Sequence, residues 1–154
     1  MTYPEYRKDL QNIHESEVYG RAVFDTAAKL SLSQARKDKW LALRALEEQT
    51  LNRYLEYMGT SGQTITEPFG QALKGRVEGA ALALMPWRLA MTLVRRATGP
   101  FQQRFLRLKD HADGEDKKFF AYVYAHEKAI EAFADKELKK DPNSLTAVHA
   151  LLDG

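Results

Sequence analysis

The chain has 154 residues, of which 44% are hydrophobic and 29% are charged, a composition typical of one globular domain, here spanning 1–154, with a buried core. Its 23 basic and 21 acidic residues give a net charge of +2 and are scattered along the chain, which argues against a nucleic-acid-binding face. The absence of cysteine excludes disulfides, thiol catalysis and thiolate metal sites. The polar N-terminal sequence MTYPEYRKDL and the shortness of the apolar run 79–87 predict neither export nor membrane insertion, so we expect a cytoplasmic protein.

The first half of the chain predicts two long helices and a loop. The helices are expected over 4–30 and 33–58, because Ser31 or Ser33 can cap the second one. The segment 59–68 has the glycine, threonine and proline content of a loop. No segment shows the alternation of apolar and polar residues that marks a strand, so the expected fold class is all-α.

The second half predicts four more helical segments. A third helix is expected from about Pro68, kinked or broken at Pro86 and ended by Gly99 and Pro100. The remaining predicted segments are a short amphipathic helix FQQRFLRLKDHA, a long helix over 115–139 and a short C-terminal helix SLTAVHALL.

Glutamates interrupt the apolar faces of these helices near their middles. Glu17 lies on the inward line of the first helix, and Glu127 lies at the centre of the apolar line of the helix over 115–139. On the second helix one apolar line places Glu48 inward and a neighbouring line places Glu47 inward, so both alternatives stay open. The third helix is apolar on more than one side, and Glu78 lies on one candidate inward line.

Position along the helices brings these glutamates to a common level. Glu17 lies about 15 residues before a turn near Leu32 and Glu48 about 16 after it, so antiparallel helices would hold both roughly 23 Å from the turn. Glu48 and Glu78 are each about 10 residues from the loop that joins their helices, and Glu127 is near the middle of its own helix. Unpaired buried charges cost several kcal/mol each, so such a cluster requires protons, basic partners or a cation.

A bound hard cation is the interpretation that accounts for all of these carboxylates, because one ion could be coordinated by several of them. Oxygen ligands with some imidazole suit iron or manganese. His14 lies three residues before Glu17 on the same helix face, whereas His126 is adjacent to Glu127 and points about 100° away from it. The alternative is that ion pairs neutralise the glutamates. The arginines available for such pairs are Arg21, Arg44, Arg76 and Arg88.

Three stretches resemble the ferritin and rubrerythrin family of di-iron proteins. EEQTLNRYL is similar to the second-helix stretch in which a Glu-x-x-His pair binds iron, HESEVYGRAVF to the first helix and YAHEKAIEAFADKEL to the fourth. The resemblance implies a ferritin-like antiparallel four-helix bundle with extra short helices after the third helix and at the C-terminus. The metal ligands to be tested are Glu17, Glu48, Glu78, Glu127, His14 and His126.

The sequence departs from this family at both histidines of the Glu-x-x-His pairs. Leu51 follows Glu48 and Ile130 follows Glu127 at the matching positions, and neither can bind a metal. Two hypotheses follow. The chain is an iron or manganese oxidoreductase that activates dioxygen or peroxide, with no substrate indicated by the sequence, or it is a metal-free bundle that acts as an interaction or structural module. The family's tendency to self-associate implies a homodimer.

Overall fold

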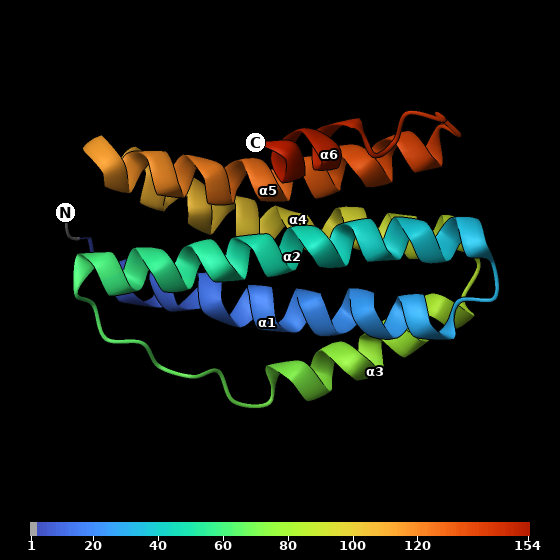
Figure 1. The fold of residues 1–154 in the computed structure, drawn as a ribbon, viewed down its shortest axis with the longest axis horizontal. Helices are drawn as coiled ribbons and strands as arrows, with labels where there is room; N and C mark the ends of the chain where they lie inside the picture. Colours follow the sequence, from blue (N-terminus) through green and yellow to red (C-terminus); the bar gives the residue numbers. More distant parts are fainter. Residues whose placement is uncertain (1–2) are drawn as a thin grey trace.

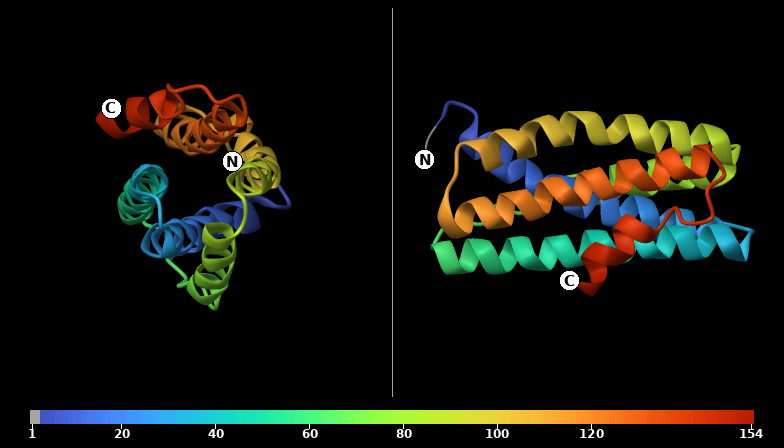
Figure 2. Two further views of the ribbon diagram at one scale, coloured as in Figure 1. Left: turned by 90° about the vertical axis from the view of Figure 1, so that its right-hand side faces the viewer. Right: turned by 90° about the horizontal axis from the view of Figure 1, so that it is seen from above.

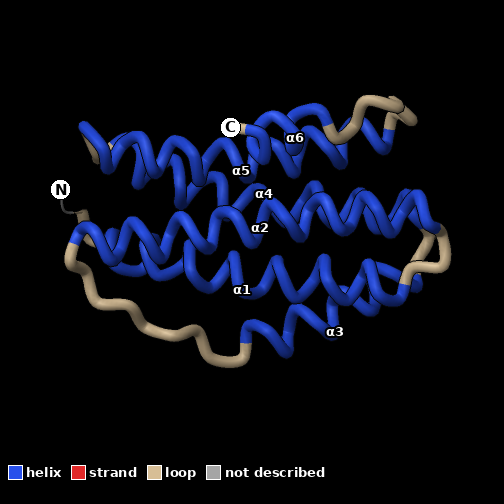
Figure 3. Tube along the Cα trace, viewed as in Figure 1, coloured by secondary structure: helices blue, strands red, loops and turns tan. Residues whose placement is uncertain are grey.

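In a computed structural model, which describes residues 3–154, the chain folds into helices without any strand among those residues (Figures 1 and 3). The six helices of this described part are α1 (Tyr6–Leu30), α2 (Gln34–Ser61), α3 (Gln71–Leu84), α4 (Trp87–Asp110), α5 (Gly114–Leu138) and α6 (Thr146–Asp153). The prediction of an all-α fold is confirmed. Over the same residues, no helix combines the length and the apolar character needed to cross a membrane.

The four long helices form two antiparallel pairs. Consecutive helices α1 and α2 contact one another, as do α4 and α5, and all four run along the long axis of the molecule (Figures 1 and 2). Helix α3 packs on α1, outside the two pairs, and α6 folds back onto α5 and α2. The pairs face each other, so side chains from α1 and α2 meet side chains from α5.

The turn between α1 and α2 lies where the sequence predicts it. Helix α1 ends at Leu30, and the hydroxyl of Ser33 accepts a hydrogen bond from the Arg36 backbone N–H at 3.3 Å, which caps α2. Helix α2 ends at Ser61 and is followed by Gly62, whose φ of 69° is readily adopted by glycine. The second helix is therefore slightly longer than expected.

The chain from Pro86 to Asp110 differs from the prediction. Pro86 separates α3 from α4, as expected, but α4 then continues through Gly99 and Pro100 to Asp110. The predicted helix end at Gly99 and Pro100 is therefore wrong, and the stretch FQQRFLRLKD, 101–110, is the end of α4 and not a separate helix. The physical reason is packing: the buried face of α4 is continuous across this point, while Pro100 is exposed, so water can reach the carbonyl that lacks a helical donor.

Helix α3 is held close to α1 by two glycines. A Cβ atom added at Gly75 or Gly79 would collide with the α1 backbone at Tyr19 or Val23. The outer side of α3 and the residues beside it stay exposed. The large apolar side chains exposed there are Phe69, Leu73, Val77 and Leu84.

Two apolar clusters fill the interior, one toward each end of the long helices. One cluster includes Val23, Phe24, Trp40, Leu43, Met91, Ile130 and Phe133. The other includes Leu10, Ile13, Tyr54, Met58, Phe105, Phe120 and Val123. Between the clusters, α1, α2 and α5 contribute buried polar residues that form the layer described below.

Replacing Pro100 by alanine is expected to stabilise the protein by up to about 3 kcal/mol, because alanine restores a helical N–H and removes the proline ring from the preceding turn. Gly99→Ala should add a smaller gain of about 1 kcal/mol, since a Cβ there meets nothing within 4 Å. Urea unfolding followed by circular dichroism measures both changes. Unchanged or reduced stability in both variants would mean that α4 does not continue through this turn.

Candidate metal centre

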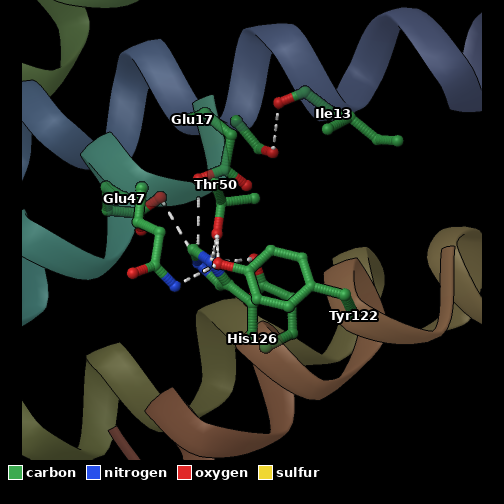
Figure 4. A network of polar contacts seen from close by, with 9 residues as sticks. Ile13, Glu17, Glu47, Thr50, Tyr122 and His126 are labelled. Carbon is green, nitrogen blue, oxygen red and sulfur yellow. Dashed lines mark hydrogen bonds and ion pairs between the residues drawn. The ribbon is translucent and has the colours of Figure 1, made fainter. Parts of the chain in front are cut away.

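Three helices bring Glu17, Glu47 and His126 together in the layer between the apolar clusters (Figure 4). His126 Nε2 lies 3.4 Å from Glu47 Oε2 and 3.7 Å from Glu17 Oε2. One potential ligand atom from each residue lies within 4.8 Å of the other two, and all three side chains are buried. This buried group could hold a metal ion.

The polar atoms of this group have the spacing and the chemistry that a cation requires. Metal–oxygen and metal–nitrogen bonds of about 2.0–2.2 Å place two ligand atoms of one ion roughly 3–4 Å apart, which matches the separations from His126 Nε2. Within residues 3–154, both carboxylate oxygens of Glu17 and Nε2 of His126 are buried without a hydrogen-bond partner. Buried polar atoms are costly when unpaired, so a bound cation would supply the partner that these atoms lack.

A chain of hydrogen bonds orients His126 from its other ring nitrogen. Thr50 Oγ1 lies 2.6 Å from His126 Nδ1 and 2.9 Å from the Tyr122 hydroxyl. The Gln49 side-chain amide donates to Tyr122 at 2.9 Å and to the Leu151 carbonyl at 2.8 Å, which ties the layer to α6. A metal-binding imidazole commonly donates its second N–H to a neighbouring acceptor, and Thr50 is placed to accept it when Nε2 binds a metal.

The position of Glu47 depends on a glycine across the helix pair. A Cβ added at Gly20 of α1 would overlap the carboxylate of Glu47. Any larger residue at position 20 would displace this carboxylate from its present position. The absence of a side chain at Gly20 therefore leaves the space that the Glu47 carboxylate of α2 occupies.

Lysine and arginine side chains do not neutralise the glutamates of the layer. In the described part of the chain, no lysine or arginine forms a salt bridge with any of the three buried glutamates of α1, α2 and α5. Arg44 pairs with Asp25 at 2.8 Å, and Arg88 donates to the Leu138 carbonyl at 3.2 Å. The described structure therefore lacks the arginine–glutamate ion pairs that the alternative interpretation requires.

Burial and mutual repulsion shift the pKa values within the layer. Burial raises the pKa of Glu17 well above its ordinary value, and the nearby Glu47 carboxylate adds to the rise. Burial raises the pKa of Glu127 to about 8, against the opposing effect of His126. Burial lowers the pKa of His126, but the Glu47 and Glu127 carboxylates outweigh it and the net shift is upward. Without a metal, these shifts favour the protonated forms of Glu17 and Glu127.

The structure places three of the predicted ligands in the layer and corrects a fourth. Glu17 and His126 belong to the convergent group, and the Glu127 carboxylate lies beside it, 3.9 Å from His126 Nε2. Glu48 is exposed, so its interpretation as the inward residue is wrong, and Glu47 on the neighbouring line is the buried glutamate of α2. Glu47 and Glu48 are adjacent in the sequence, so their side chains point in directions about 100° apart around the axis of α2.

The other two predicted ligands lie outside the layer. Glu78 is on α3 with a side chain 45% exposed, and it accepts a hydrogen bond from the Tyr19 hydroxyl at 2.8 Å. It is displaced because the third long helix is α4 and not the segment that contains Glu78. His14 is buried against the Tyr54 ring, with Nε2 3.9 Å from Glu67 Oε2, and it does not join the group.

The sequence interpretation did not identify Thr50. Once Glu47 is the inward residue, the position three residues later is Thr50 and not Leu51, and the signal for this residue is its i, i+3 spacing from Glu47 on one helix face. A threonine there orients His126 from across the helix pair. The layer therefore contains one imidazole, contributed by α5.

Comparison with protein-family models, with curated proteins and with solved structures finds no significant match.

The metal-free protein should lose stability as pH rises. Because the pKa of Glu127 is raised from 4.5 to about 8, the folded protein keeps a proton that the unfolded chain releases, so this contribution is fully present below pH 4.5 and is lost as pH rises through 8. We expect the melting temperature in chelator to fall between about pH 5.5 and about pH 8.5. Glu127→Gln should flatten this dependence, and equal slopes for both proteins would contradict the assignment.

Proposed function

We propose that this chain is a ferritin-like helical bundle that binds one iron or manganese ion through Glu17, Glu47 and His126 and acts as an oxidoreductase. The observation that carries the proposal is the convergence of these three donors, with unpartnered oxygen and nitrogen atoms, in a buried layer where no lysine or arginine of residues 3–154 pairs with the glutamates. Two antiparallel pairs of long helices with inward glutamates are also what ferritin-like metal sites use.

The donor set favours iron or manganese. Magnesium and calcium prefer ligand sets made of oxygen atoms only, whereas this group adds an imidazole nitrogen. Structural zinc sites are closed by four protein ligands, usually with cysteine, and this chain has no cysteine. Two carboxylates also balance the charge of one divalent ion, which removes the main cost of burying them.

The side of the layer that faces α4 is open to a small molecule. The Thr98 hydroxyl of α4 donates to the Arg95 carbonyl of its own helix at 2.8 Å and is not directed at the group. A cavity of about 400 Å³ lies here, lined by α4 residues including Ala97 and reaching Glu47. A bound iron or manganese ion would supply redox chemistry toward dioxygen or peroxide at positions that the protein leaves free.

Two adjacent glutamates provide a matched test of metal binding. Purified without chelator or histidine tag, the wild-type protein should bind about one equivalent of manganese or ferrous iron per chain, with a rise in melting temperature by linkage. Glu47→Gln removes a charged ligand and should weaken binding at least about tenfold. Glu48→Gln removes the same charge from the exposed neighbour and should leave binding unchanged. Elemental analysis and thermal unfolding measure both effects.

Two results would contradict the metal proposal. One is a wild-type protein that binds no metal and gains no thermal stability from added manganese or iron. The other is an equal loss of metal in both variants, which would attribute binding to general negative charge and not to the buried group.

The exposed apolar residues of α3 favour a second candidate function, that of a metal-free module that self-associates. Leu73, Val77 and Leu84 are 64–80% exposed, and exposed apolar patches often mark interaction sites. On this account the wild-type chain is a dimer in sedimentation experiments, and Val77→Asp makes it monomeric with unchanged unfolding free energy. A monomeric wild-type chain would exclude this candidate.

A further inference from the structure

A side cavity extends from the buried layer to the surface between α1, α3, α4 and α5. Its volume of about 400 Å³ lies within the range of small-molecule pockets, roughly 300–1,000 Å³. Its walls are mainly apolar and aromatic. Those wall residues include Tyr19, Phe24, Leu82, Met85, Val94 and Phe101.

The inner end of the side cavity is acidic. Glu47 and Glu127 both line it. Glu127 is only 4% exposed, and within residues 3–154 it accepts no hydrogen bond from another side chain and has no lysine or arginine partner. Among the described residues its one ion-pair partner is His126, whose Nε2 lies 3.9 Å away, so a buried carboxyl group without lysine or arginine borders the cavity.

The other charged residues of the side cavity reinforce its negative character. Glu78 lines the cavity and accepts a hydrogen bond from Tyr19, whereas Arg96 is the one basic residue among its lining residues in the described part of the chain. The cavity thus has three carboxylates, counting Glu47 and Glu127, against one guanidinium. This balance disfavours anionic ligands, whereas a protonated amine would stabilise the ionised form of Glu127 that burial otherwise disfavours.

We propose that the side cavity binds a small organic amine, with its protonated amino group on the Glu127 carboxylate and its apolar body against Tyr19, Phe24 and Phe101. The inference rests on the proposed metal centre in one respect: the ion occupies Glu17 and Glu47, so Glu127 is the carboxylate left for the ligand. The amine is then held beside the metal ligands, which makes amines of this kind the substrate class of the site.

The interaction types of this site match such a ligand. A charge-assisted hydrogen bond between an ammonium group and a carboxylate is stronger than a neutral one, and more so where the carboxylate is buried, as Glu127 is. Aromatic rings favour cations and apolar groups, and both are parts of an arylalkylamine. An alcohol of the same shape would bury the same apolar surface without compensating the charge of Glu127.

Three molecules of one shape test the proposal: 4-phenylbutylamine, 4-phenylbutanol and 4-phenylbutyrate. Their affinities are measured by isothermal titration calorimetry, with manganese and with chelator, alongside the metal content of each protein. The wild-type protein should bind the amine at least about tenfold more tightly than the alcohol or the carboxylate. Glu127→Gln should reduce amine affinity to that of the alcohol without reducing metal content. Retained alcohol binding in this variant shows that the cavity is still folded.

Two control variants locate the effect. Glu48→Gln removes an equal charge outside the cavity and should keep the amine preference. Val94→Phe adds a ring to the cavity wall and should weaken all three ligands, with folding checked by circular dichroism.

The outcomes separate this inference from the metal proposal. An amine preference that disappears in Glu127→Gln supports the inference. If the wild-type protein holds no metal but shows this Glu127-dependent preference, the metal proposal fails and the amine site stands. The inference is overturned if 4-phenylbutyrate binds as tightly as the amine or if Glu127→Gln keeps the preference. It is also overturned if Glu127→Gln loses its metal, because Glu127 is then a metal ligand and not the amine partner.

Discussion

Three carboxylates are buried in the middle of the helical interior, and the rest of the structure depends on how their negative charge is neutralised. Glu17, Glu47 and Glu127 lie between two apolar clusters, and no lysine or arginine of the described chain forms a salt bridge with them. Burial of unpaired charges at this level costs several kcal/mol each, so protons or a cation must neutralise them. The raised pKa of Glu17 is the consequence when protons do so.

The surrounding structure supports this layer from several sides. Gly20 leaves room for the Glu47 carboxylate, and Thr50 holds the second ring nitrogen of His126. Helix α6 joins through the hydrogen bond that Gln49 donates to its backbone. These contacts stabilise one arrangement of donors, and preorganised donors are what a metal site requires. The side cavity adds access from the α4 side, so the same layer combines a cation-binding group with space for a ligand.

The sequence predicted the parts of the fold that depend on local signals. Apolar periodicity and the Ser33 cap located α1 and α2, and glutamates centred in apolar lines indicated a carboxylate layer. Two features depended on tertiary packing and were not predictable. Glu47 and Glu48 each lie near an apolar line, and only contact with α1 selects Glu47. Gly99 and Pro100 signal a helix end locally, but continuous packing of α4 against α5 overrides that signal. Glu78 lies outside the layer because it is on α3, which packs on the outside of α1.

Anomalous diffraction from crystals grown with manganese tests the central claim most directly. One anomalous peak within bonding distance of Glu17, Glu47 and His126, about 2.0–2.2 Å, is the predicted result. Crystals that diffract well but show no peak there, or a peak only beside His14 and Glu67, would contradict the account. The buried carboxylates would then be neutralised by protons alone.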